Sequence, residues 1–273
     1  MPENSIVEST PSPRTRATLA QDLRQLGVRE GMTLIVHSSL KSLGWVSGGP
    51  VTVVEALCDV LTEEGTLIMP TQTLHLSDPA EWRNPPVPRE WWQAIYDSMP
   101  VFHPEITPSY KMGVIVETFR TWPGTLRSNH PHVSFAACGR HARYLTERHE
   151  RDYGLGEGSP LARLYELDGW TLLLGVGFDS CTALHLAEYR AAGGREIEMG
   201  CPLYENGQRI WGAYRDIDVN SSVFPEIASE FARSSEVLTG PVGSAPATLA
   251  PVKPLIDFAT GWYTRKRGES ASS

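Results

Sequence analysis

The 273-residue sequence lacks any apolar run close to the roughly 20 residues that a membrane-spanning helix requires. Its first residues, MPENSIVESTPSPRTR, are polar and rich in proline and serine, and they lack the apolar segment of a secretory signal. We therefore expect no membrane association. We also expect a disordered tail over residues 1–15 and a second, short one over residues 269–273.

Cysteine is scarce, with four residues at positions 58, 138, 181 and 201 and no C-x-x-C pair. In a chain of this length, scattered cysteines are typical of free thiols in a reducing compartment. His130 and His132 are separated by a proline and have no third ligand nearby in the sequence, which disfavours a zinc site. The sequence thus predicts a cytoplasmic protein without a metal.

Basic residues are outnumbered, since 24 Lys and Arg face 32 Asp and Glu and give a formal charge of −8. Surfaces that bind phosphates need clustered Lys and Arg, so nucleic acid is not an expected partner. A cationic ligand would suit this charge, although solubility alone also accounts for it. The P-loop, the dinucleotide-binding glycine pattern and the G-x-S-x-G turn of hydrolases are absent as well, which disfavours those enzyme classes.

The sequence does contain a strand, a glycine-containing loop, a helix and a second strand over residues 33–70. A short apolar run over 33–36 precedes HSSLKSLGW, the segment VTVVEALCDVLTEEG has helical spacing, and TLIMP reads as a buried strand. This order predicts two parallel strands joined by a right-handed crossover. Ligands of such sheets gather beyond the carboxyl ends of the strands, so HSSLKSLGW and PTQTLHLSD are candidate site segments.

A second module of this kind lies further along the chain. Ser159 and Pro160 can start a helix, WTLLLGVG reads as a buried strand, and Asp179 or Ser180 can cap a helix that runs to about Ala192. A hairpin is expected around the Asn-Gly pair at 206–207, and residues 77–110 form a Trp- and Pro-rich excursion with one short helix. We predict an α/β fold, a sandwich with a central mixed, largely parallel sheet flanked by helices, as a single domain over residues 16–268.

Candidate catalytic residues cluster after the second strand. His185 and Glu188 are three apart on the predicted helix, so they form either a general base with its carboxylate or a surface ion pair. Asp216 and Asp218 alternate on a predicted strand and face one side of it, either exposed or orienting His185. Cys181 precedes His185 by four residues and is either a nucleophile or a packing residue.

Five blocks of the sequence together resemble the aminoglycoside 3-N-acetyltransferase family, in order from about residue 17 to about residue 265. They are VHSSLKSLGWVSGGPVTVVEAL, RSNHPHVSFAACG, GEGSPLARLYELDG, LLLGVGFDSCTALHLAE and GPVGSAPATL. The resemblance implies transfer of acetyl from acetyl-CoA to the 3-amino group of a 2-deoxystreptamine antibiotic, by direct attack and without a metal, which would give antibiotic resistance. The expected partners are acetyl-CoA and a cationic aminoglycoside or other amine, with a homodimer as the assembly considered.

The resemblance also implies roles for individual residues. His185 matches the general base, and Asp216 becomes the preferred carboxylate over Glu188, which is left as helix-face support. Asp78 is the nearest match to a further acidic residue after the MP block, and Ser39 or a backbone N–H of HSSL would hold the oxyanion.

Binding residues follow from the same blocks and loops. The CoA arm is expected along His37, Ser38, Ser39, Leu40, Lys41, Ser42, Leu43, Gly44, Met112, Gly113, Val114, Gly243, Ser244 and Ala245. Substrate contacts are expected from Thr73, His75, Asp78, His130, Asp216 and Asp218.

Overall fold

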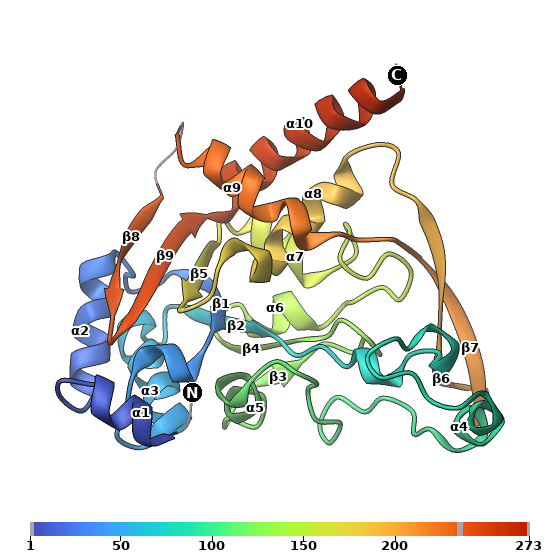
Figure 1. Cartoon of the computed structure of the whole chain (residues 1–273), viewed down its shortest axis with the longest axis horizontal. Helices are drawn as coiled ribbons and strands as arrows, with labels where there is room; N and C mark the ends of the chain where they lie inside the picture. The colour runs from blue at the N-terminus through green and yellow to red at the C-terminus, as the bar shows by residue number, and fades with distance from the viewer. Residues whose placement is uncertain (1–2, 234–236, 272–273) are drawn as a thin grey trace.

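The computed structural model describes residues 3–233 and 237–271, and a seven-stranded mixed sheet with strand order β3-β4-β2-β1-β5-β9-β8 lies at its centre (Figure 1). The pairings β2-β1 and β1-β5 are parallel, as the crossover pattern predicts, and the outer pairings are antiparallel. The mixed α/β sheet predicted from the sequence is therefore confirmed, but it is not largely parallel, because four of its six strand pairings are antiparallel. Its strands are β1 (Thr33–Ser38), β2 (Thr66–Pro70), β3 (Leu126–Arg127), β4 (Phe135–Gly139), β5 (Trp170–Leu174), β8 (Leu238–Val242) and β9 (Ala245–Pro251).

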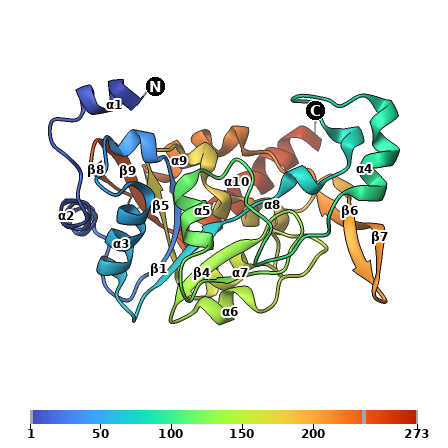
Figure 2. The ribbon, with the colours of Figure 1, turned by 90° about the horizontal axis from the view of Figure 1, so that it is seen from below.

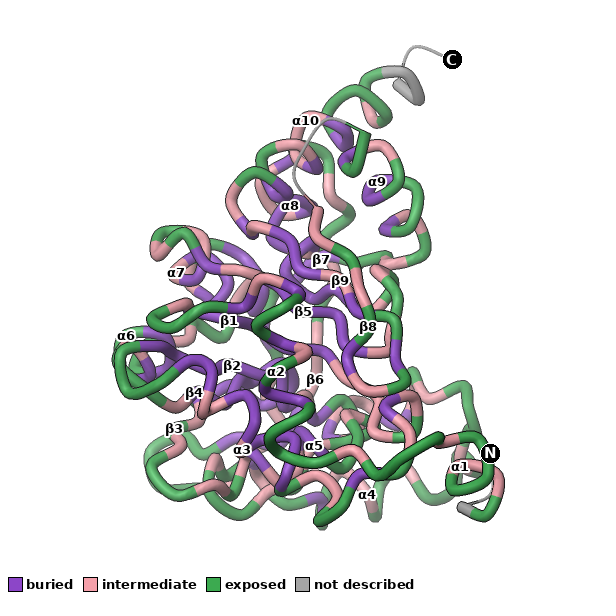
Figure 3. The backbone as a smooth tube through the Cα atoms, turned by 90° about the vertical axis from the view of Figure 1, so that its left-hand side faces the viewer, coloured by how far each residue is buried: buried purple, intermediate pink, exposed green. Residues whose placement is uncertain are grey.

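Helices cover both faces of this sheet. One face carries α2 (Arg16–Leu26), α3 (Gly49–Leu61) and α5 (Val114–Arg120), and the other carries α6 (Ala142–Thr146), α7 (Pro160–Glu166), α8 (His185–Arg190), α9 (Phe224–Phe231) and α10 (Val252–Ala271). Successive strand residues point to opposite faces, so Leu34 and Val36 pack with the first set and Ile35 packs with the second. The same alternation directs His37 toward the face that carries α8. The inner strands β1, β2 and β5 form the buried centre of the molecule (Figure 3).

A separate two-stranded sheet pairs β6 (Glu196–Glu205) with β7 (Gln208–Ile217). Its turn is the predicted Asn206-Gly207 pair, and both residues have the positive φ angles (50° and 78°) that tight hairpin turns require. The hairpin packs beside the excursion over 77–110, which contains α4 (Trp92–Ser98) (Figure 2). Trp211 meets Tyr96 edge-on at 4.7 Å between ring centroids, and Arg209 donates to the carbonyl oxygen of Tyr96 at 2.7 Å.

The chain termini differ from the sequence-based expectation. Glu3–Ser9 form a helix, α1, and Arg14 pairs with Val46 in a parallel bridge, where a disordered tail was predicted. At the other end α10 continues to Ala271, and residues 1–2 and 272–273 of the predicted tails lie outside the described residues. Within residues 3–233 and 237–271, no helix combines the length and the apolarity that a membrane crossing would need.

The entry into α8 also differs. Two single 3₁₀ turns, Phe178–Ser180 and Thr182–Leu184, follow β5, and the α-helix begins only at His185 and ends at Arg190. Neither Asp179 nor Ser180 caps it, because Cys181 adopts a non-helical backbone (φ −75°, ψ 84°) between the two turns. His185 is therefore presented from the first turn of α8.

Candidate active site

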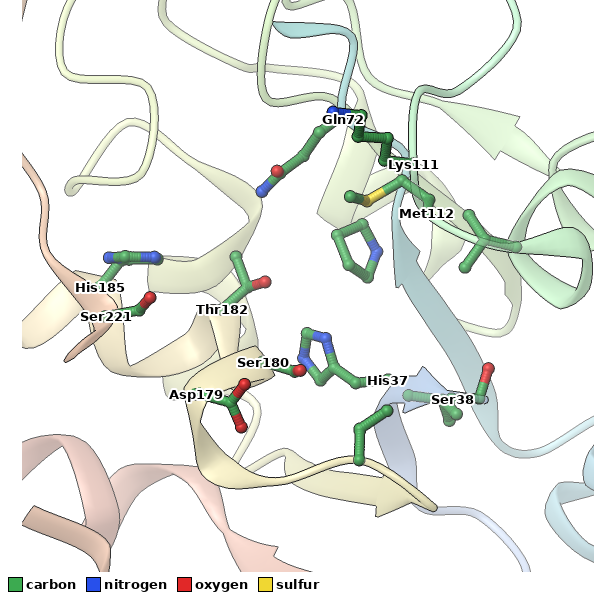
Figure 4. A pocket seen from close by; sticks show the side chains of 14 residues that line it. His37, Ser38, Gln72, Lys111, Met112, Asp179, Ser180, Thr182, His185 and Ser221 are labelled. Atoms are coloured by element: carbon green, nitrogen blue, oxygen red, sulfur yellow. The ribbon is translucent and has the colours of Figure 1, made fainter. Parts of the chain in front are cut away.

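A cavity of about 360 Å³ lies beyond the carboxyl ends of β1 and β2 and beside the loop that follows β5. This is the edge of the sheet where the crossover pattern predicts a ligand. His37 and Ser38 enter it from the end of β1, and His185 enters it from α8 (Figure 4). Six further polar side chains that the sequence analysis did not single out as ligand contacts also line it: Gln72, Lys111, Asp179, Ser180, Thr182 and Ser221.

His185 and Glu188 form a hydrogen-bonded pair. His185 Nδ1 lies 2.5 Å from Glu188 Oε2, and the Glu188 side chain is only 3% exposed. The second oxygen of Glu188 accepts from the backbone N–H of Asn220 at 2.9 Å, which fixes the carboxylate. Because a carboxylate only accepts, Nδ1 of the neutral imidazole carries the proton and Nε2 keeps its lone pair. This arrangement suits a general base.

Asp216 does not contact His185, so the structure contradicts the preference for it as the partner of the base. Its Oδ1 accepts from the hydroxyl of Tyr189 at 2.6 Å and from the N–H of Ile217 at 2.9 Å. Burial raises the pKa of Asp216, although both hydrogen bonds oppose this shift. Glu188 follows His185 by three residues and is the carboxylate that bonds to its ring. Asp216, on β7, instead bonds to Tyr189 near the C-terminal end of α8.

Two polar atoms at the end of β1 have no hydrogen-bond partner within the described part of the chain. They are His37 Nε2 and Ser38 Oγ. His37 is 6% exposed, and burial, with a smaller effect of the nearby His185, lowers its pKa to about 3. Its imidazole is therefore neutral at physiological pH. Unpartnered buried polar atoms are rare in proteins and mark places where a ligand can supply the missing bond.

Ser39 is committed to contacts within the protein. Its N–H donates to the carbonyl oxygen of Leu174 at 3.0 Å, and its hydroxyl oxygen lies 2.9 Å from the Ser42 hydroxyl. Of the donors predicted for this segment, the Ser39 amide is therefore not free to hold an oxyanion.

The segments expected to hold the CoA arm come together in space. The N–H of Ser244 donates to the carbonyl oxygen of Leu43 at 3.0 Å, which joins the β8–β9 turn to the loop after β1. The approach is close enough that a Cβ on Gly44 would lie 2.6 Å from Ser244 Oγ, so only glycine fits there. Met112 lines the cavity itself, and Gly113, with a φ of 87°, is the N-cap residue that precedes α5.

A second cavity of about 950 Å³ opens between the excursion and the β6–β7 hairpin. Its walls carry four carboxylates and one guanidinium, so they hold three net negative charges: Asp78, Glu81, Glu198 and Asp218 against Arg195. Arg195 is already paired with Asp218 at 2.5 Å. Sequence reasoning found Asp78 and Asp218, but it missed Glu81 and Glu198, whose placement depends on how the hairpin packs. The cavity suits a ligand with several positive charges.

Thr73 and His130 were expected at the substrate but lie in the interior. Both are 0% exposed, and the Thr73 hydroxyl donates to the carbonyl oxygen of Pro131 at 2.6 Å. His130 Nδ1 accepts from the N–H groups of His132 and Val133 at 3.1 and 3.0 Å. Their contacts hold the loop before β4.

His75 and Cys181 are also occupied by packing. The His75 ring packs against Tyr110 at 4.8 Å between ring centroids and a tilt of 41°, and burial lowers the pKa of His75. Cys181 is 0% exposed, and burial raises the pKa of its thiol to about 11, which leaves no reactive thiolate. Among the described residues, no group of three or more His, Cys, Asp or Glu is arranged to hold a metal ion.

Comparison with known proteins gives consistent matches along the chain. Residues 35–264 match the family model described as aminoglycoside 3-N-acetyltransferase. The chain is 47% identical to the SPbeta prophage-derived aminoglycoside N(3')-acetyltransferase-like protein YokD of Bacillus subtilis, over 94% of this chain and 95% of the relative. The crystal structure of YokD superimposes with a TM-score of 0.95, at 46% identity, covering 97% and 98% of the two chains.

Two solved structures with bound ligands are similar as well. AAC-IIIb in a binary complex with CoASH has a TM-score of 0.82 at 33% identity and covers 93% of this chain and 98% of its own. AAC-VIa bound to sisomicin has a TM-score of 0.84 at 32% identity, with 93% and 99% covered.

Proposed function

The chain belongs to the aminoglycoside 3-N-acetyltransferase family, and from this premise we propose that it transfers acetyl from acetyl-CoA to the 3-amino group of a 2-deoxystreptamine aminoglycoside. The observation that carries the proposal is the His185–Glu188 pair, which opens on a cavity at the ligand-binding edge of the sheet. We assign the activity to residues 16–268 as one catalytic domain that acts in the cytoplasm, where it would confer resistance to the drug.

Acetyl-CoA is supported as the acetyl donor by the groups around the first cavity. The pantetheine arm carries two amides, which need hydrogen-bond partners where they leave water. Ser38 Oγ offers an unpartnered atom, and the loop after β1 meets the β8–β9 turn beside it. The similar structure of AAC-IIIb holds CoASH.

The amine substrate is assigned to the acidic cavity between the excursion and the hairpin. Aminoglycosides carry several ammonium groups, and carboxylates in a partly enclosed cavity concentrate such cations. Asp78, Glu198 and Asp218 line this cavity, and the similar structure of AAC-VIa holds sisomicin, an aminoglycoside.

His185 performs the proton transfer in this proposal. Only the neutral amine, whose ammonium proton has passed to solvent, can attack a thioester, and Nε2 of His185 has the free lone pair to accept the proton that the nitrogen loses as it attacks. Glu188 holds Nδ1–H and stabilises the imidazolium that forms. Glu188 therefore both orients the His185 ring and stabilises its positive charge at the moment of attack.

The proposal is tested by measuring CoA release from acetyl-CoA with gentamicin-, kanamycin- and apramycin-type amines, and with spermidine as a polyamine that is not an antibiotic. We expect turnover with aminoglycosides and a product acetylated at the 3-amino nitrogen by NMR. The variant His185→Ala should lose about 100-fold or more of kcat, and His141→Ala, at the opposite end of the sheet, should not.

Other outcomes separate the alternatives. Turnover with spermidine alone would mean that the same chemistry serves a different amine. Binding of acetyl-CoA without turnover of any amine would mean a catalytically idle CoA-binding protein, and near-normal turnover by His185→Ala would remove the assigned base.

A further inference from the structure

His37 is a buried imidazole that the fold itself does not use. It stands at the end of β1, its ring lines the first cavity, and its Nε2 has no hydrogen-bond partner within residues 3–233 and 237–271 (Figure 4). A buried ring nitrogen normally bonds to the protein or to water. His130 and His149 do so, since Nε2 of each lies within 3.1 Å of a backbone carbonyl oxygen.

Other donors close to the end of β1 are engaged. The Ser39 N–H bonds to the carbonyl oxygen of Leu174, and the Ser42 hydroxyl, 2.9 Å from Ser39 Oγ, donates to the Gly175 carbonyl oxygen. The side chains of His37 and Ser38 keep unpartnered atoms at this place. A carbonyl oxygen that enters the cavity over β1 therefore finds these two side chains as donors.

We propose that the neutral imidazole of His37 donates a hydrogen bond to the carbonyl oxygen of the acetyl thioester and holds that oxygen when it becomes negative. This inference rests on the proposed acetyl transfer and adds a second histidine with a different role. His185 accepts a proton, whereas His37 never changes its protonation state.

A neutral imidazole is suited to this task because its N–H is retained throughout the reaction. Burial and the nearby His185 keep the pKa of His37 far below physiological pH, so it cannot compete with His185 for the proton of the amine. The groups that face it across the cavity are His185 and Asp179 from the α8 side and Lys111 from the segment before α5. A His185 imidazolium disfavours protonation of His37 further.

The chemical step balances with these two residues. The amine nitrogen forms a bond to the thioester carbon, the π electrons move to the oxygen held by His37, and His185 accepts a proton from the nitrogen. When the carbonyl re-forms, the carbon–sulfur bond breaks and its electron pair leaves with the CoA thiolate. The proton on His185 then passes to that sulfur, which yields the acetylated amine and CoA.

The test is the infrared band of the thioester carbonyl in acetyl-CoA labelled with ¹³C at that carbon and bound to the protein. Hydrogen bonding in the wild type should shift the band to lower frequency than in water. In His37→Phe, which keeps an aromatic ring, the shift should disappear, and kcat should fall about 100-fold to 1000-fold. His37→Gln retains an N–H donor and should recover part of both effects.

CoA without the acetyl group provides the control, since its affinity should be equal in the wild type and both variants if the cavity is intact. Ser38→Ala removes the other unpartnered atom and should leave the band shifted. An unshifted band in the wild-type complex overturns the inference without any variant. So does a shift that disappears in Ser38→Ala but persists in His37→Phe.

Failure of the proposed function has a different signature. A wild-type protein that binds no acetyl-CoA would overturn both proposals together. A wild type that binds and turns over, with His37→Phe retaining its rate and its band, would overturn the role of His37 alone.

Discussion

The first turn of α8 sets the chemistry of His185. Glu188 lies one turn further along, buried and fixed by the Asn220 N–H, so it can both orient the ring and stabilise its charge. The spacing of three in the sequence indicated this pair. The family resemblance favoured Asp216 instead. Only the structure shows that β7 passes Tyr189, so that Asp216 bonds to the Tyr189 hydroxyl and not to His185.

This difference predicts opposite results for two isosteric variants. Glu188→Gln removes the charge that stabilises the imidazolium, so kcat should fall at least about tenfold. Asp216→Asn keeps the shape of the contact with Tyr189 and should leave kcat nearly unchanged. Steady-state rates of both variants measure this, and a loss of kcat in Asp216→Asn but not in Glu188→Gln would restore Asp216 as the partner.

At the scale of elements, α10 contacts the C-terminal end of α8, the helix that carries His185. Arg267 donates to the carbonyl oxygens of Ala191 and Ala192, at 2.5 and 2.9 Å, where α8 ends. A cation at this end also interacts favourably with the helix dipole. Its guanidinium lies 5.3 Å from the ring of Tyr263, which fixes its position.

We expect Arg267→Ala to lower the free energy of unfolding by on the order of 1 kcal/mol and to lower kcat, because the carbonyl oxygens at the end of α8 lose their donor. The exposed neighbour Arg265→Ala should change neither. Urea unfolding and steady-state rates measured on both variants check this. Equal behaviour of the two would show that α8 needs no support from α10.

The elements that the sequence predicted are those with strong local signals. The crossover over 33–70, the strand at 170–174 and the hairpin turn at 206–207 all depend on apolar runs or turn residues that act within a few positions. Strands β8 and β9 were missed because they contain Pro241 and Pro246, which are rare inside sheets. Pro241 is tolerated because β8 is an edge strand, and Pro246 lies opposite it, at the start of β9 beside the turn.

The candidate site was predicted in the same uneven way. His37, at the end of β1, and His185, in the helix that follows β5, could be placed from the order of the elements. The acidic cavity could not, because Glu81 and Glu198 meet only when the excursion packs against the hairpin.

For the whole molecule, buried neutral histidines set the response to acid. Burial lowers the pKa of His132 and of His149 to about 4, from an ordinary value of 6.5. The unfolded chain binds protons on these side chains between pH 6.5 and about 4 while the folded chain does not, so acid favours unfolding in that range.

The buried histidines should therefore cause no change of the unfolding free energy with pH above 6.5. It should fall by about 1.4 kcal/mol per pH unit for each buried histidine as the pH drops from 6.5 towards 4. Urea titrations between pH 4 and pH 8 measure the slope. His103→Ala, which changes an exposed histidine, should leave it unchanged, and a stability independent of pH in this range would contradict the assignment.

The β6–β7 hairpin forms a sheet of its own beside the excursion, while the base and the end of β1 belong to the main body. Under the proposed function, substitutions in the walls of the acidic cavity can therefore accumulate without disturbing the residues assigned to the acetyl transfer. Under selection for a new amine substrate, we expect adaptive mutations at positions such as 81, 198 and 218, and purifying selection at 37, 185 and 188. The range of amines accepted would then evolve faster than the reaction itself.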